Sequence, residues 1–286
     1  MSVREYLVPR SLPEAIGLLE RHGSELLVMA GGTVAMPLIN EGISLPERVM
    51  SLRGAGLDRI ERRADDLAIG AAATLSALLA QDALPLLAQA AAHTASWPIR
   101  NLATVGGNLF TPPPGGDVGV ALLALDARVR LAGPGGERSL ALADFFTGFM
   151  ASALAPDELL VEIVVPLVAR ETAFIKLGRK QANTPAVVTV AIALERVAGR
   201  VAGARIALGA AGPHPIRIRA AEAAIDGTGL EPADIERAAA AAVAGSRPFT
   251  DGVATEWYRR RMVGVIVRRA LESIAAPARD LAGEGR

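Results

Sequence analysis

Apolar positions along this chain recur with two periods, that of an α-helix and that of short buried strands. The strongest helical stripe runs from residue 255 to 274, where one face carries Val263, Ile266, Val267, Ala270, Leu271 and Ile274. An earlier helix is predicted after Ser11, because Glu14 follows at capping-box spacing and an apolar stripe continues to Arg21. Short apolar runs bounded by turn residues predict strands at 26–29, 49–52, 57–62, 67–71 and 159–166.

The remaining pattern divides the chain into two parts. In the first half, further helices are predicted through Asn40 with Thr33 as the cap, from Thr74 onward, and from 85 to 94, where Trp97-Pro98 ends the helix. Residues 166–172 have the composition of a linker, and strand candidates follow at 173–177, 187–195 and 201–210. Because helical patterns fill the rest of the second half, the order of elements predicts an α+β protein of two domains.

Composition and charge exclude several classes of function. The chain has 286 residues, of which 51% are apolar, and this is enough for a buried core and two domains. Thirty basic residues balance thirty acidic ones, so no overall field attracts nucleic acid. The absence of cysteine removes disulfides, thiolate metal sites and iron–sulfur ligation on this chain.

Hydropathy and the N-terminal segment bear on location. No apolar run reaches the roughly 18 to 20 residues that a membrane span requires. The segment MSVREYLVPR lacks the apolar centre of a secretory signal, which predicts a cytoplasmic protein.

Two islands of paired glycines are the strongest candidates for chemistry. The first is VMAGGTVA at 28–35, and the second is TVGGN at 104–108, within RNLATVGGNLFTPPPGGD. Glycine tolerates positive φ and lets a ligand approach the backbone, so successive N–H groups can form a nest for phosphate without a lysine. Each island alone is also explained by a tight turn. Together they predict that both converge on the diphosphate of one dinucleotide, with Thr33, Thr104 and Asn108 adding donors.

Common nucleotide and catalytic fingerprints are absent. Neither island fits G-x-G-x-x-G, no glycine is followed by lysine, and G-x-S-x-G and H-E-x-x-H do not occur. His22, His93 and His214 lie in unrelated segments and receive no role. The last helix carries five arginines that are interpreted as a solvated face, with a subunit contact as the alternative: Arg259, Arg260, Arg261, Arg268 and Arg269.

The ordered motifs resemble the FAD-binding medium subunit of the molybdenum hydroxylases. VMAGGTVAMPLI is similar to the first FAD motif of that family, and IRNLATVGGNL followed by Asp117 is similar to the second. FIKLGRKQANTPAVVTVAIAL resembles the start of its C-terminal domain, and EWYRRRMVGVIVRRAL resembles its closing helix. The resemblance implies a two-lobed FAD-binding domain of the PCMH or vanillyl-alcohol-oxidase type at 1–168, with subdomains of about 1–55 and 56–168. It implies a smaller domain at 169–286, with a three-stranded antiparallel sheet and a helical bundle.

The resemblance also implies residue roles and partners. It implies that FAD is bound by Val28, Met29, Ala30, Gly31, Gly32, Thr33, Val34, Ala35, Thr104, Val105, Gly106, Gly107, Asn108, Asp117, Leu160 and Lys176. Asp117 would accept hydrogen bonds from FAD hydroxyls, and Leu160 and Lys176 would approach the isoalloxazine. A large molybdopterin-binding subunit and a small subunit with two [2Fe–2S] clusters are the implied partners, as a dimer of heterotrimers that reduces an external acceptor through FAD.

Alternatives stay open on the residues alone. Asp117 is equally explained as a turn or helix-cap residue, and Lys176 is better explained as a solvated lysine at a strand end. The run 111–116 departs from the family in its three prolines, and loop 179–185 lacks acidic residues, which argues against NAD⁺ as the acceptor. Two other functions fit the pattern: a nucleotide-binding scaffold subunit without redox activity, and a free-standing FAD oxidoreductase of another fold.

Overall fold

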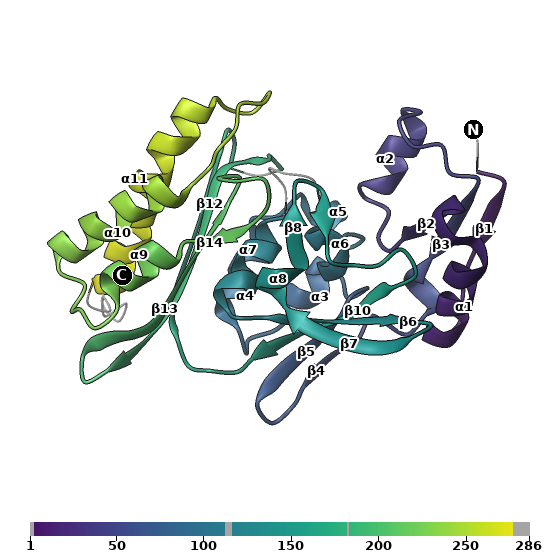
Figure 1. The fold of residues 1–286 in the computed structure, drawn as a ribbon, viewed down its shortest axis with the longest axis horizontal. Helices are drawn as coiled ribbons and strands as arrows, with labels where there is room; N and C mark the ends of the chain where they lie inside the picture. The colour runs from purple at the N-terminus through teal and green to yellow at the C-terminus, as the bar shows by residue number, and fades with distance from the viewer. Residues whose placement is uncertain (1–2, 112–115, 182, 277–286) are drawn as a thin grey trace, which may run out of the picture.

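The computed structural model describes residues 3–111, 116–181 and 183–276, in three parts that follow one another along the long axis of the molecule (Figure 1). Each part has its own sheet: three strands in the N-terminal lobe, five in the middle, and four in the C-terminal part. The prolines 112–114 of the second island's loop lie outside the described residues.

The N-terminal lobe is a small parallel sheet with one helix packed on it. Its strand order is β1–β3–β2, with both neighbours of β3 parallel to it. The elements are β1 (Glu5–Leu7), α1 (Leu12–His22), β2 (Leu26–Met29), α2 (Ala35–Asn40) and β3 (Arg48–Ser51), with 3-10 turns at Gly23–Glu25 and Leu52–Gly54. Ser11 caps α1 as predicted, by accepting from the Glu14 N–H at 3.3 Å.

The middle part is a five-stranded antiparallel sheet that is covered by short helices. Its order is β4–β5–β10–β6–β7. The strands are β4 (Ile60–Arg62), β5 (Asp66–Gly70), β6 (Arg128–Gly133), β7 (Gly136–Ala141) and β10 (Leu159–Pro166), and β8 (Phe146–Gly148) and β9 (Ala151–Ser152) form a separate hairpin. The helices are α3 (Leu75–Leu79), α4 (Pro85–Ala92), α5 (Trp97–Arg100), α6 (Val105–Leu109), α7 (Asp117–Ala124) and α8 (Leu142–Phe145).

Helix α7 is central to the molecule, because all eight of its residues are buried. Its sequence DVGVALLA is apolar around the whole circumference after the first residue, which is the pattern of a helix enclosed on every side. It packs against α4 in the middle part and against β12 and β13 of the C-terminal sheet. Helix α7 therefore joins the two parts.

The C-terminal part confirms the predicted antiparallel sheet and adds a fourth short strand. The strands are β11 (Glu171–Gly178), β12 (Ala186–Val197), β13 (Arg200–Gly209) and β14 (Ile216–Arg217), and the helices are α9 (Arg219–Ile225), α10 (Pro232–Gly245) and α11 (Glu256–Ala275). On β12, alternate residues face α7 or the helical layer, as the two core clusters show. This explains why the strand is apolar at almost every position.

Several local predictions are wrong in ways that have a physical cause. Thr33 does not cap α2, because the cap residue is Val34 and no side chain accepts there. Pro98 does not end a helix but lies in the first turn of α5, where a missing N–H and fixed φ suit a helix start. The strand predicted at 57–62 begins only at Ile60.

Candidate cofactor-binding site

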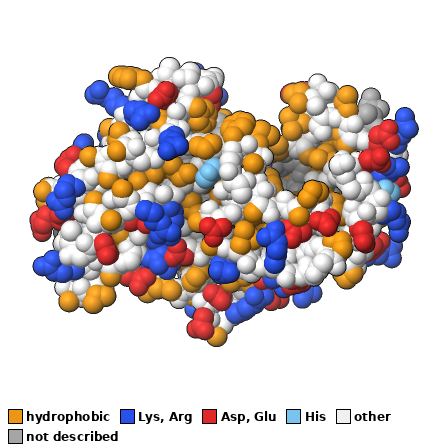
Figure 2. Space-filling model, in the orientation of Figure 1, with side chains coloured by type: hydrophobic (Ala, Val, Ile, Leu, Met, Phe, Trp, Pro, Cys, Tyr) orange, Lys and Arg blue, Asp and Glu red, His pale blue; other side chains and the backbone are white. Residues whose placement is uncertain are grey.

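A cavity of about 770 Å³ separates the N-terminal lobe from the middle part and extends to β11. The space-filling view shows the hollow between the N-terminal lobe and the rest of the molecule (Figure 2). This volume lies within the roughly 300 to 1,000 Å³ typical of small-molecule and cofactor sites. All the predicted site residues line the cavity except Val105, whose side chain is fully buried in the main core.

The first island touches the segment that precedes the second island. A Cβ built on Gly31 would lie 1.9 Å from the Leu102 carbonyl oxygen and 3.1 Å from the Ala103 Cα. Only glycine fits at position 31, because the backbone of residues 102 and 103 passes directly against it. Gly32 has a φ of 72°, in the left-handed region that favours glycine. The two islands, about seventy residues apart in sequence, thus meet at one cavity.

The first island also presents unsatisfied main-chain donors. Within the described part of the chain, the structure records no acceptor for the N–H groups of residues 31–34, although all four residues line the cavity. Gly31, Gly32 and Thr33 are half-buried and Val34 is exposed, so these N–H groups are accessible from the cavity. Successive accessible N–H groups of this kind favour an anionic ligand.

The second island plays a different part from the one predicted, because its N–H groups are already bonded. Val105 and Gly106 donate to the carbonyls of Ala73 and Ala71 at 2.8 and 2.9 Å. Gly107 donates to the Thr104 hydroxyl oxygen at 3.0 Å, and Asn108 donates to the Thr104 carbonyl at 3.0 Å. The prediction that both islands bare their amides is therefore wrong for the second island.

The glycines of the second island instead serve close packing and space. A Cβ on Gly106 would lie 2.6 Å from the Ala71 carbonyl oxygen, so this glycine lets α6 approach the end of β5. Gly107 is exposed on the cavity wall, and a Cβ there would meet only the Thr104 hydroxyl, at 2.9 Å. Any larger side chain at 107 would consequently occupy cavity space.

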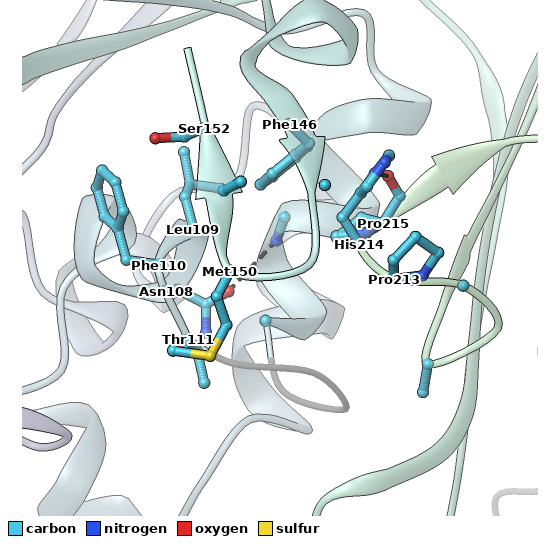
Figure 3. Close-up of a pocket in the computed structure, with 16 residues that line it drawn as sticks. Asn108, Leu109, Phe110, Thr111, Phe146, Met150, Ser152, Pro213, His214 and Pro215 are labelled. Atoms are coloured by element: carbon cyan, nitrogen blue, oxygen red, sulfur yellow. Dashed lines mark hydrogen bonds between the residues drawn. The ribbon is translucent and has the colours of Figure 1, made fainter. Parts of the chain in front are cut away.

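Asn108 connects the second island to α7. Its Oδ1 accepts from the N–H groups of Val118 and Gly119 at 3.1 and 3.3 Å, which caps the helix from outside, as the dashed line in Figure 3 shows for one of them. The amide nitrogen keeps two N–H donors for another partner. Asn108 lines both the large cavity and a smaller one of about 90 Å³, whose lining also includes Phe146, Met150 and His214 (Figure 3).

Asp117 and Lys176 form a buried ion pair at the cavity wall. The Lys176 ammonium lies 2.6 Å from Asp117 Oδ2 and donates to the His93 carbonyl at 2.9 Å. The two side chains are only 7% and 5% exposed, so the interpretation of Lys176 as a solvated lysine is wrong. Asp117 is the first residue of α7, but Gly116 is the cap, and the second carboxylate oxygen accepts from the Thr189 hydroxyl at 2.6 Å.

Two further features of the cavity wall were not predicted from the sequence. Glu158 lines the cavity and accepts a two-pronged hydrogen bond from Arg138 at 2.6 and 2.7 Å. This bond, helped by the Ala155 N–H, holds the pKa of the Glu158 carboxyl below its usual value. Ala95, which also lines the cavity, has a φ of 53°, an uncommon conformation for a residue with a side chain. Neither signal is visible in a single sequence.

One arginine of the last helix also differs from its prediction. Arg259 is fully buried, and its guanidinium donates to the carbonyls of Ala186 and Val187 at 3.2 and 2.5 Å and to Asp251 at 2.6 Å. It therefore fixes the start of β12, next to the cavity-lining residues 183–185, rather than facing solvent. His93 contributes only its carbonyl to the site, as the acceptor for Lys176.

The donor set fits a dinucleotide. Free main-chain N–H groups and the Asn108 amide are suited to phosphate oxygens, and a carboxylate suits hydroxyl groups. Most of the remaining wall is apolar, with Leu160 among its buried residues, which suits a planar ring system. Across residues 3–111, 116–181 and 183–276, no three acidic or histidine side chains gather as metal ligands. In the same ranges, no helix combines the length and hydropathy needed to cross a membrane.

Comparison with known proteins covers almost the whole chain. A family model described as the FAD binding domain in molybdopterin dehydrogenase matches residues 1–168, and one described as the CO dehydrogenase flavoprotein C-terminal domain matches residues 172–274. The carbon monoxide dehydrogenase medium chain of Afipia carboxidovorans is 32% identical, over 96% of this chain and 98% of that protein. Subunit alpha of the 6-hydroxypseudooxynicotine dehydrogenase complex of Paenarthrobacter nicotinovorans is also 32% identical, over 96% and 95%. A structure of reconstituted CO dehydrogenase from Oligotropha carboxidovorans superimposes with a TM-score of 0.92, at 32% identity, over 97% of this chain and 99% of that chain.

Proposed function

Because the chain belongs to the FAD-binding medium subunits of molybdenum hydroxylase complexes, we propose that it relays electrons within such a complex. It receives them from the [2Fe–2S] clusters of a small partner subunit and delivers them to an external acceptor. A large molybdopterin-binding subunit oxidises the substrate. When bound, FAD supplies the electron exchange itself, and the residues of this chain bind, orient and electrostatically tune the cofactor.

Each part of the cavity wall has a role in this proposal. The N–H groups of residues 31–34 bind the diphosphate, and the amide nitrogen of Asn108 adds a donor. Asp117 retains lone pairs on both oxygens beyond those used by Thr189 and Lys176, so it can still accept from a hydroxyl of the ligand. Leu160 and Lys176 lie beside the isoalloxazine, where a fixed ammonium favours negative charge on the reduced ring.

The convergence of the two islands on one cavity is the observation that carries the proposal. A turn that served only the fold would not need four consecutive cavity-lining residues whose N–H groups have no recorded acceptor among the described residues. A further glycine, Gly107, lines the same cavity and leaves space there that a side chain would fill. These features are independent of each other, and a bound diphosphate and its neighbouring atoms explain both.

Reoxidation of the complex with and without flavin tests the relay. The complex is reduced with dithionite under anaerobic conditions, freed of excess reductant, and mixed with dichlorophenolindophenol while the [2Fe–2S] signals are followed by EPR. We expect rapid loss of the reduced-cluster signal, much slower loss after FAD is stripped, and recovery after FAD is added back. Equal rates with and without FAD would contradict the relay and favour a nucleotide-binding scaffold.

Domain organisation, assembly and location complete the proposal. The FAD-binding domain comprises residues 1–168, with subdomains of about 1–55 and 56–168, and the C-terminal domain begins at 169. The complex is a dimer of heterotrimers in the cytoplasm. Native mass spectrometry of the purified complex measures this stoichiometry directly, and a mass for a single heterotrimer would correct it.

A further inference from the structure

A single polar side chain interrupts the buried run of β12. Residues 186–194 read AVVTVAIAL, and every one of them is buried. Thr189 is 1% exposed, and its hydroxyl donates to Asp117 Oδ1 at 2.6 Å. Valine has nearly the same shape and fills neighbouring positions of the strand. Since a buried hydroxyl is costly unless it is bonded, the bond to Asp117 explains why this position is not valine.

Thr189 and Lys176 act on the same carboxylate from adjacent strands. They are direct cross-strand partners in the β11–β12 register. Such a pair shares one face of the sheet, with the side chains close together. Thr189 binds Asp117 Oδ1 and Lys176 binds Asp117 Oδ2, so the sheet holds both oxygens of a carboxylate that belongs to α7. The carboxylate therefore cannot rotate without breaking one of these bonds.

A glycine on the neighbouring strand β13 lets α7 pack close enough to the sheet for Thr189 to reach Asp117. Gly209 is the cross-strand partner of Thr189 on β13. A Cβ on Gly209 would lie 2.5 Å from Cγ2 of Val120, which is one helical turn after Asp117, and 3.3 Å from the Thr189 Cβ. A side chain at 209 would push α7 away from the sheet and lengthen the Thr189–Asp117 bond.

We propose that Thr189 is a positioning residue, which fixes the Asp117 carboxylate so that Lys176 holds its ammonium at the cavity wall. Thr189 does not line the cavity, and it acts on the ligand only through these two residues. This inference rests on the proposed function, because it concerns the binding and tuning of the same FAD. Without the hydroxyl, Asp117 loses one of its two fixed contacts, and Lys176 loses part of the support that keeps its charge in place.

The test compares Thr189→Val with Thr189→Ser in the full complex. Valine keeps the volume and removes the hydroxyl, whereas serine keeps the hydroxyl. FAD is removed and titrated back while its fluorescence is followed, and the midpoint potential of the bound flavin is measured. We expect Thr189→Val to weaken FAD binding by about three- to tenfold, because only part of the contribution of one charge-assisted hydrogen bond is lost. We also expect it to lower the midpoint potential of the bound flavin. Thr189→Ser should restore most of both.

Thr172 on β11 provides a matched control. Thr172 lies on the same face of β11 as Lys176, and its hydroxyl has no recorded partner among the described residues. Thr172→Val should therefore leave affinity and potential unchanged. If Thr189→Val changes only the melting temperature, with wild-type affinity and potential, the positioning role is wrong while the proposed function stands. If the unmodified complex binds no FAD at all, the proposed function itself fails.

Discussion

Replacing Gly31 by alanine is the sharpest perturbation of the contact between the islands. The built Cβ lies 1.9 Å from the Leu102 carbonyl oxygen and 2.7 Å from its carbon, whereas real Cβ contacts essentially never fall below 3.0 Å. The two backbones must therefore separate by roughly 1 Å, and neither can yield by turning a side chain. Overpacking of this kind costs about 1 to 3 kcal/mol of the free energy of unfolding.

The same displacement acts on the cofactor site. The N–H groups of residues 31–34 would move relative to Asn108 and Gly107, which line the same cavity. A shift of this size lengthens each hydrogen bond beyond its useful range, so we expect FAD affinity to fall at least about tenfold, the equivalent of roughly one charge-assisted bond.

Urea unfolding and FAD titration of the reconstituted complex measure the two effects. Gly17→Ala is the matched control, because Gly17 lies within α1 and a Cβ there meets nothing within 4 Å. That variant should keep wild-type affinity and gain up to about 1 kcal/mol in stability, since alanine favours the helix. Wild-type stability and affinity in Gly31→Ala would refute the account of how the islands meet.

Three further substitutions test separate parts of the wall. Gly107→Val should abolish or strongly reduce flavin content, because the added side chain fills cavity space on an exposed residue, with a smaller loss of melting temperature than Gly31→Ala, since its Cβ meets only the Thr104 hydroxyl, at 2.9 Å. Lys176→Met leaves the buried Asp117 carboxylate without its cation and should destabilise the chain by about 3 kcal/mol in thermal unfolding, whereas Lys180→Met, at an exposed position, should not. The pKa of the Glu158 carboxyl is lowered in the folded state, mainly by the bidentate hydrogen bond from Arg138. The ionised carboxylate therefore stabilises the fold above about pH 4.5, and this stabilisation is lost as the pH falls further. The melting temperatures of the wild type and Glu158→Gln should therefore differ by a constant amount from pH 7 to about 5 and converge below that, and a gap that widens on acidification would contradict this.

Much of the architecture was predictable because hydrophobic periodicity is a local property. The apolar stripe at 255–274 became α11, and the three strands after residue 170 became β11, β12 and β13 with only small changes at their ends. The glycine islands identified the cavity for the same reason, since glycine pairs between apolar runs mark unusual backbone. Local pattern was sufficient wherever one segment's own burial decided its structure.

The errors arose where a distant segment decides the structure. Thr104 caps α6 as a threonine should, but Thr33 does not cap α2, and nothing in the local sequence separates the two. Lys176 and Arg259 were interpreted as solvated because charged residues are rarely buried. Yet Lys176 pairs with Asp117 of α7, and Arg259 donates to carbonyls at the start of β12 as well as to Asp251. The amides of Val105 and Gly106 find acceptors on residues 73 and 71, a pairing that only the folded chain reveals.

The flavin content of the purified complex tests the central claim most directly. The absorption spectrum of the protein as isolated, and of the nucleotide released on denaturation, gives the ratio of FAD to this chain. The account predicts a yellow complex with close to one FAD per chain, and a marked loss of flavin in Gly107→Val. A colourless, nucleotide-free complex with its partner subunits intact, or unchanged flavin in that variant, would contradict it.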